Sequence, residues 1–198
     1  MAPHSSTLAW LIIVLLITHL GFIPWFSGAA ITILQVPVIL GALLAGLWPG
    51  VGLGAIFGIA SLIQASISPT GGLDPYFTNP LISVVPRMLI GFVTYFSLKG
   101  LLLATKKLPK AFEVFSYGVA AFLGSLANTF FVLTSLVVFA QASTWELLFA
   151  VLISNGILEA VASVILSVAV ISVVKVVAHK KSKLSEIDDD ENTNEDLE

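Results

Sequence analysis

The stretch Phe77-Thr-Asn-Pro-Leu-Ile-Ser-Val-Val-Pro-Arg-Met-Leu-Ile-Gly91 places Arg87, the only arginine of the chain, inside a segment otherwise apolar enough to enter a membrane. A guanidinium keeps its charge, and at bilayer depth that charge is costly unless it is paired or faces water. Two interpretations follow. Arg87 lines a pocket and binds an anion, or it has a structural role, pairing with a carboxylate or reaching the lipid headgroups.

The composition of the whole chain defines its class. Of the 198 residues, 57% are hydrophobic and 11% are charged, and the mean hydropathy is +1.01. No Asp, Glu, Lys or Arg precedes Asp74. Because a soluble domain cannot present such a sequence to water, the chain is predicted to be an all-α, multi-pass membrane protein. The absence of cysteine excludes disulfides and thiolate metal sites.

Apolar runs predict six membrane helices, over residues 8–26, 36–48, 51–66, 81–104, 113–140 and 145–178. Pro24 is expected to end or kink the first helix, and Pro49-Gly50 to end the second. The loop between the first two helices covers residues 27–35, and its residues 31–35 are predicted to be extended and to dip into the structure, because Pro37 disfavours helix just before it. The alternative is an ordinary loop between helices. Small residues at four-residue spacing favour close helix packing, as at Gly46, Gly50, Gly54 and Gly58.

Two groups of lysines predict the orientation. One flanks the loop after the fourth helix and the other follows the sixth: Lys99, Lys106, Lys107 and Lys110, then Lys175, Lys180, Lys181 and Lys183. Since positive loops stay in the cytoplasm, both termini are predicted to be cytoplasmic. Loops 27–35, 68–80 and 141–144 then face outward. Residues 1–180 are predicted to form a six-helix membrane domain, and residues 181–198 a disordered acidic cytoplasmic tail.

Few polar residues lie within the predicted helices, and intramembrane polar groups together suggest a shared cavity. Counted along the helices, Arg87, Asn155 and Glu159 can meet at one outward-open pocket. The other candidate binding residues are Asn128 in the fifth helix and, in or near outward loops, Thr32, Gln35, Tyr76 and Asn79. The alternative for the asparagines is hydrogen bonding between helices. For Glu159 it is a salt bridge, with Arg87 as a candidate partner. Loop 68–80 is either a lid over the pocket or a solvated connector.

Several classes of function are not supported by any motif. The chain contains no GxxxxGK[ST] loop for ATP and no HExxH metal motif. It also has no series of intramembrane acids that would form a proton or sodium pathway. The sequence therefore predicts neither an enzyme nor a cofactor site, but a binding protein without its own energy source.

Four motifs follow one another along the chain: Ile31-Thr-Ile-Leu-Gln-Val-Pro-Val-Ile39, Gly46-Leu-Trp-Pro-Gly-Val-Gly-Leu-Gly54, Asn79-Pro-Leu-Ile-Ser-Val-Val-Pro-Arg87 and Asn155-Gly-Ile-Leu-Glu159. Their order resembles that of the substrate-binding subunits, or S components, of energy-coupling factor (ECF) vitamin transporters. The resemblance implies a six-helix vitamin-binding subunit in the lipid bilayer that works with a transmembrane coupling subunit and two cytoplasmic ATPases. It implies that vitamin binds from outside, under loops 27–35 and 68–80. The first helix lacks the alanine-xxx-alanine docking motif that many members carry.

The resemblance leaves the choice of vitamin to the polar residues. Arg87 suits a carboxylate, which it can hold by two parallel hydrogen bonds. Asn128 and Asn155 suit amide and hydroxyl groups, so the chain looks like a pantothenate subunit. Biotin, niacin and folate are also anionic, and a hydroxymethylpyrimidine or pyridoxine subunit would use Glu159 with stacking by Tyr76 or Phe77. A structural membrane subunit is the alternative outside transport, and no nucleic-acid partner is expected.

Overall fold

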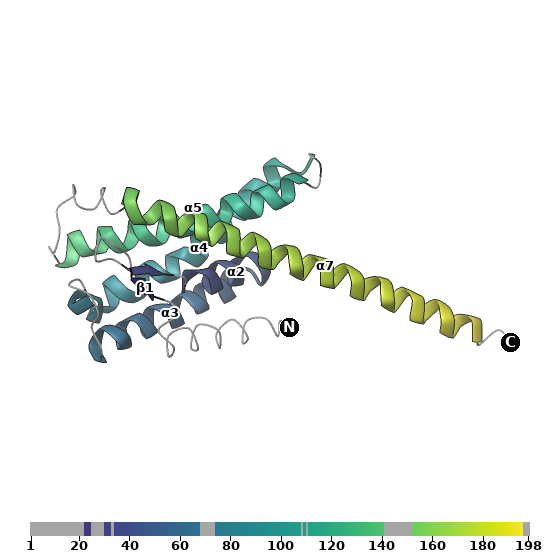
Figure 1. The fold of residues 1–198 in the computed structure, drawn as a ribbon, viewed down its shortest axis with the longest axis horizontal. Helices are drawn as coiled ribbons and strands as arrows, with labels where there is room; N and C mark the ends of the chain where they lie inside the picture. Colours follow the sequence, from purple (N-terminus) through teal and green to yellow (C-terminus); the bar gives the residue numbers. More distant parts are fainter. Residues whose placement is uncertain are drawn as a thin grey trace.

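The structure is a computed structural model that describes residues 22–24, 30–32, 34–67, 74–107, 109, 111–140 and 152–195. Figure 1 shows a helical bundle whose elements run roughly along one axis. In chain order they are β1 (Phe22–Pro24), β2 (Ala30–Thr32), α2 (Gln35–Leu44), α3 (Leu47–Ile67), η1 (Asp74–Thr78), α4 (Pro80–Ala104), α5 (Ala111–Ser135), η2 (Leu136–Ala140), η3 (Leu152–Gly156) and α7 (Ile157–Glu195).

Helix α2 occupies the centre of the bundle and contacts α3, α4, α5 and α7. Every residue from Gln35 to Leu43 is buried. A helix that is apolar on all sides is expected in such a position, because no face of it has to meet a polar environment. The main apolar core surrounds this helix and includes Val38, Ile39, Phe57, Ile90 and Ala121.

The break between the second and third helices lies earlier than Pro49-Gly50, so that prediction is wrong. Helix α2 ends at Leu44 and α3 begins at Leu47. Gly46 makes the turn with φ of 101°, a left-handed conformation that glycine adopts at little cost. Pro49 instead lies in the first turn of α3, where a missing N–H removes no helical hydrogen bond.

Glycines bring α3 and α4 into close contact, as the small-residue spacing predicts. A Cβ at Gly54 would lie 2.9 Å from the Arg87 carbonyl carbon, and one at Gly58 would lie 2.5 Å from Val84 Cα. A Cβ at Gly91 would lie 2.6 Å from the Gly50 carbonyl carbon. No other residue type fits at these positions without separating the two backbones.

The end of the first predicted helix is not helical. Residues Phe22–Pro24 form β1, which pairs antiparallel with β2, with Ile23 opposite Ile31. The extended prediction for residues 31–35 is confirmed at residues 31–32, which lie in β2, but Gln35 already begins α2. The pairing gives both extended segments backbone partners, which irregular chain at membrane depth requires. The rest of the first predicted helix, residues 8–21 and 25–26, lies outside the described residues.

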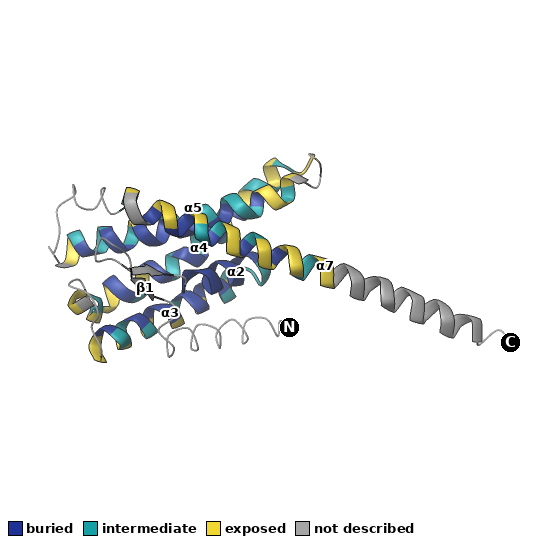
Figure 2. Cartoon of the chain, viewed as in Figure 1, coloured by how far each residue is buried: buried dark blue, intermediate teal, exposed yellow. Residues whose placement is uncertain are grey.

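Within the described residues, four helices are long and apolar enough to span a membrane: Leu47–Ile67, Pro80–Ala104, Phe112–Phe139 and Ile157–Val177. Helix α2 has 10 residues. At ~1.5 Å per residue it covers about half of a hydrocarbon core of about 30 Å, so it is not a complete span. Figure 2 shows that the exposed residues line the outside of the bundle. Many are large and apolar, as lipid contact requires, among them Ile59, Ile63, Phe96, Phe115 and Val173.

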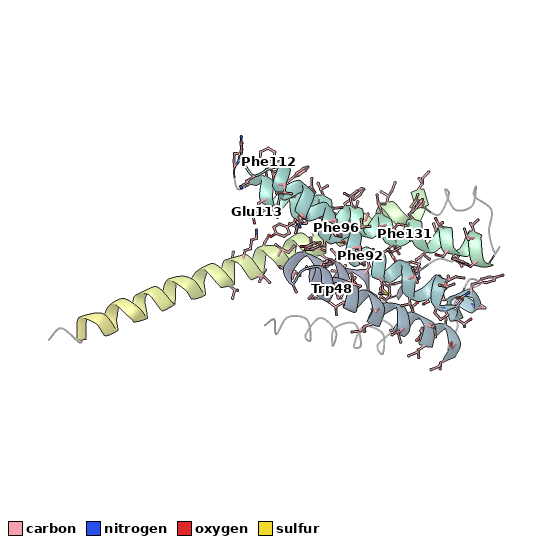
Figure 3. The ribbon with its side chains drawn as sticks, turned by 180° about the vertical axis from the view of Figure 1, so that it is seen from behind. Trp48, Phe92, Phe96, Phe112, Glu113 and Phe131 are labelled. Carbon is pink, nitrogen blue, oxygen red and sulfur yellow. The ribbon has the colours of Figure 1, made fainter. Side chains whose placement is uncertain are left out.

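The turn after α4 and the far end of α7 leave the bundle at the same end (Figure 1). Near this end, Lys175 Nζ on α7 contacts Glu113 Oε1 on α5 at 2.7 Å. Figure 3 shows Glu113 directed toward α7. Helix α7 continues to Glu195 where the sequence predicts disorder, since no glycine or proline follows Gly156 to stop it. The division into a membrane domain and a tail stays a prediction.

Candidate functional site

Arg87 lies in the second turn of α4, and its side chain is 7% exposed. Pro86 precedes it inside the helix. Proline has no N–H, so the carbonyl of Ile82, four residues earlier, loses its helical donor. Arg87 Nη1 donates to that carbonyl at 2.8 Å. The guanidinium therefore satisfies a backbone acceptor that the neighbouring proline has released.

Two aromatic rings flank this guanidinium. Its carbon Cζ lies 5.5 Å from the centroid of the Phe57 ring on α3 and 4.9 Å from that of Phe77 on η1. Such cation–π contacts stabilise a desolvated cation and hold its plane. Arg87 Nε is nevertheless buried without a hydrogen-bond partner among the described groups. One donor of the only arginine thus faces the interior with no acceptor.

The packing of α3 on α4 fixes the backbone beneath Arg87. The absence of a side chain at Gly54 lets the Arg87 carbonyl approach α3. One turn further, Ser83 Oγ donates to the carbonyl of Gly58 at 2.9 Å. Hydrogen bonds and small residues together hold membrane helices close. The close packing of α3 on α4 therefore fixes the backbone from which the Arg87 side chain projects.

A second polar group lies where α2, α5 and α7 meet. The fully buried Gln35 donates from Nε2 to Ser125 Oγ at 2.7 Å and to Ser163 Oγ at 3.0 Å. Its Oε1 accepts a hydrogen bond from Asn128 Nδ2 at 2.8 Å. Asn128 is 6% exposed, and its Oδ1 has no partner among the described residues. This Gln35 cluster therefore leaves one buried acceptor free.

Glu159 on α7 links the two groups. It is 7% exposed, and Thr129 Oγ1, next to Asn128 in sequence, lies 3.5 Å from its Oε2. Its negative charge attracts the Arg87 guanidinium. Glu159, Ser163 and Ser167 recur every fourth residue and are all buried, so they form one polar stripe on α7.

Four of the predicted site residues thus belong to one buried polar region: Arg87, Asn128, Glu159 and Gln35. Two others lie differently. Asn79 caps α4 by accepting a hydrogen bond from Leu81 N at 3.0 Å, and Tyr76 is 38% exposed on η1. Thr32 lies in β2 and Asn155 in η3, and their side chains lie outside what the structure describes.

Sequence reasoning missed the serines and one aromatic residue of this region: Ser125, Ser163 and Phe57. The serines could have been predicted from their spacing, because residues three or four apart lie on one face of a helix. Ser163 follows Glu159 by four residues, and Ser125 precedes Asn128 by three. Phe57 resembles any other lipid-facing or core phenylalanine in sequence. Only the contact between α3 and α4 reveals that its ring faces Arg87.

Two cavities of the described structure lie away from this polar region. One, of about 460 Å³, is a groove between α4 and α5 lined by apolar residues such as Val93, Leu126 and Phe130. The other, of about 400 Å³, lies near the end of α2 and is lined by Tyr95, Lys99 and Leu102, among others. Neither is lined by Arg87 or Gln35.

The fold and the polar region define the class: an integral membrane helical bundle with charged and amide side chains buried at its centre. The chain belongs to the family of substrate-specific components of ECF transporters, whose family model matches residues 7–171. It is therefore a multi-pass protein of the cell membrane and a transporter subunit, not an enzyme. Membership implies that it binds a vitamin and works with other ECF subunits.

Two relatives add detail. The chain is 30% identical over 181 residues to the pantothenic acid transporter PanT of Lactococcus lactis subsp. cremoris, covering 83% of this chain and 87% of that protein. It is 34% identical over 89 residues to the pantothenate transporter PanT of Leuconostoc mesenteroides subsp. mesenteroides, covering 43% of this chain and 44% of that protein. The resemblance drawn from the sequence motifs is thus confirmed.

Proposed function

We propose that the chain is the pantothenate-binding S component of an ECF importer. The main supporting observation is the buried Arg87, whose Nε has no acceptor among the described residues of this transporter subunit. A carboxylate supplies that acceptor and adds a favourable charge interaction. The printed names of the two relatives favour pantothenate among the anionic vitamins.

The proposed contacts follow from two buried atoms with no partner among the described residues, Arg87 Nε and Asn128 Oδ1. Arg87 binds the ligand carboxylate, and Asn128 accepts a hydrogen bond from an amide or hydroxyl group. Glu159 and Asn155 complete the polar lining from α7 and η3, with Thr32 from β2. Gln35 acts through Asn128, which it holds at 2.8 Å. Tyr76 lies at the rim, and Asn79 supports the site by capping α4.

We further propose that import requires a transmembrane coupling subunit and two cytoplasmic ATPases, because the chain contains no nucleotide-binding loop. Vesicles that contain this chain alone should not accumulate pantothenate against a gradient. Accumulation without added ATPase would contradict the proposal. Adding the coupling subunit and ATPases with ATP is the matched positive control.

Identification of the ligand is the direct test. The protein is purified in mild detergent, and small molecules released on denaturation are identified by mass spectrometry. Pantothenate should copurify. Calorimetry should show saturable binding of added pantothenate, and only prior addition of pantothenate itself should abolish this binding. Recovery of biotin, niacin, folate, pyridoxine or hydroxymethylpyrimidine instead would reassign the subunit to that vitamin.

A further inference from the structure

We propose that Pro86 and the carbonyl of Ile82 form a tether that selects which edge of the Arg87 guanidinium faces the ligand. The tether makes the site bind a carboxylate side-on, through Nε and Nη2. This inference rests on the proposed function and adds the geometry by which the anion is recognised. It assigns Pro86, which touches no ligand in this scheme, a positioning role.

The tether arises from the order of two adjacent residues. In a regular helix the N–H of residue 86 would donate to the carbonyl of Ile82. Proline removes that donor, and Ile82 is only 1% exposed, so its carbonyl needs a donor from the protein. The side chain of the next residue supplies it, since Arg87 Nη1 lies 2.8 Å from the Ile82 oxygen.

The hydrogen bond from Nη1 to Ile82 determines which pair of guanidinium N–H donors is left for the ligand. A guanidinium presents N–H pairs to a carboxylate end-on through Nη1 and Nη2, or side-on through Nε and Nη2. Nη1 already uses one of its two N–H groups on Ile82, and Nε is the guanidinium nitrogen that is buried with no hydrogen-bond partner among the described residues. A buried donor left without an acceptor is costly, because it has lost its water and gained no partner. The side-on fork is therefore the one that a ligand carboxylate satisfies.

Two ring contacts and the charge of Glu159 hold the guanidinium in this orientation, and the packing of α3 fixes the backbone beneath it. The rings of Phe57 and Phe77 lie on it at 5.5 and 4.9 Å. Gly54 lets α3 close on the Arg87 backbone. Glu159 attracts the cation from α7 but does not supply an acceptor to Nε. Preorganisation of this kind lowers the cost of ordering the side chain on binding.

The test uses the fact that Arg87 is the only arginine. In full-length protein labelled with ¹⁵N-arginine, every guanidinium signal belongs to this residue. Ligand-free wild type should show separate Nη1 and Nη2 signals, because the bond to Ile82 hinders rotation. In Pro86→Ala the new N–H recaptures the Ile82 carbonyl, so the two signals should merge. Pro86→Gly restores the same N–H and should reproduce the result.

Binding supplies the second readout. By calorimetry, Pro86→Ala should bind pantothenate about tenfold more weakly. This change in Kd corresponds to about 1.4 kcal/mol of lost interaction. Its affinity for panthenol, which has an alcohol in place of the carboxylate, should change little. Thermal unfolding should occur at an equal or higher temperature, since the helix gains a hydrogen bond. Pro49→Ala, in the first turn of α3, is the matched control and should change neither readout.

Separate Nη signals in ligand-free Pro86→Ala, or an unchanged preference for pantothenate over panthenol, would overturn the tether. The proposed function fails in a different way. If wild type shows the tethered signals and Pro86→Ala merges them, but pantothenate shifts no Nε signal, the tether stands and the vitamin assignment is wrong. The two failures are thus distinguished by the ligand-free comparison.

Discussion

Asn128 Nδ2 donates to Gln35 Oε1 at 2.8 Å, which joins α5 to the first residue of α2 at the centre of the bundle. The same Gln35 donates to serines on α5 and α7. A single side chain thus satisfies polar groups from two helices. It also turns the Asn128 amide so that Oδ1, which has no partner in the described part of the chain, is left as an acceptor.

Replacing Gln35 should therefore destabilise the protein. Gln35→Leu strands Asn128 Nδ2 and removes the partner of Ser125 and Ser163, and each unsatisfied buried group costs about 1–3 kcal/mol. Thermal unfolding in detergent should shift down by several degrees. Ser116→Ala is the control, because this buried serine on α5 lies outside the Gln35 cluster, donating to Phe112 O at 2.8 Å and lying 3.5 Å from Thr105 Oγ1. Equal unfolding temperatures for the two variants would show that the cluster contributes little.

Removing Arg87 should reduce affinity for a carboxylate ligand. Hydrogen bonds to charged groups are worth ~1.5–3 kcal/mol each. Arg87→Ala should weaken pantothenate binding by roughly tenfold to several hundredfold, at about 1.4 kcal/mol per decade. Arg87→Lys should recover little, because an ammonium lacks the planar fork and cannot reach Ile82 and the ligand together. Calorimetry on the folded fraction measures both.

The structural interpretation of Arg87 makes a different prediction. If its main role is to neutralise Glu159, Arg87→Ala lowers folding yield by removing the cation that offsets the charge of this buried acid. Arg87→Met combined with Glu159→Met should then restore folding. Full pantothenate affinity in a folded Arg87→Ala protein would exclude the carboxylate contact, whatever the double variant shows.

The close contact of α3 with α4 should make Gly54 sensitive to the smallest substitution. A Cβ at this position would lie 2.9 Å from both the Arg87 carbonyl carbon and Met88 Cα. Gly54→Ala should therefore push the helices apart, cost about 1–3 kcal/mol and weaken ligand binding through Arg87. Gly52→Ala is the matched control on the same helix, since a Cβ there meets nothing within 4 Å. Similar unfolding temperatures for both variants would contradict this packing argument.

The orientation of the chain is a separate prediction. Positive residues gather at the end where the α4–α5 turn and α7 leave the bundle, and positive segments stay in the cytoplasm. The natural chain has no cysteine, so single introduced cysteines report cleanly. In intact cells Lys107→Cys and Asp190→Cys should resist an impermeant thiol reagent, while Gly71→Cys should react. Labelling of the first two from outside would reverse the topology.

Much of the fold could be predicted from composition and local pattern. Apolar runs predict α3, α4 and α5 with η2 within a few residues, because the bilayer demands about 20 apolar residues per span. Helix α7 begins later than predicted and continues to Glu195, beyond the predicted end at residue 178. Boundaries made by proline and glycine were less predictable. Pro49 is equally compatible with the end of one helix and the first turn of the next, and the positive φ of Gly46 decides between them. Residues 22–24 form a strand, which the local sequence does not predict, because they pair with β2.

The amino-acid sequence alone identifies a membrane protein. It also requires a special environment for Arg87, because a buried guanidinium keeps its charge. Tertiary packing defines what that environment is. Helix packing brings Phe57, Phe77 and Glu159 to Arg87, and gathers Ser125, Asn128 and Ser163 around Gln35. Except for Phe77, these partners are distant in sequence from the residue they surround and lie on other helices. Which side chains meet is set by how the helix faces pack, and local pattern does not encode that.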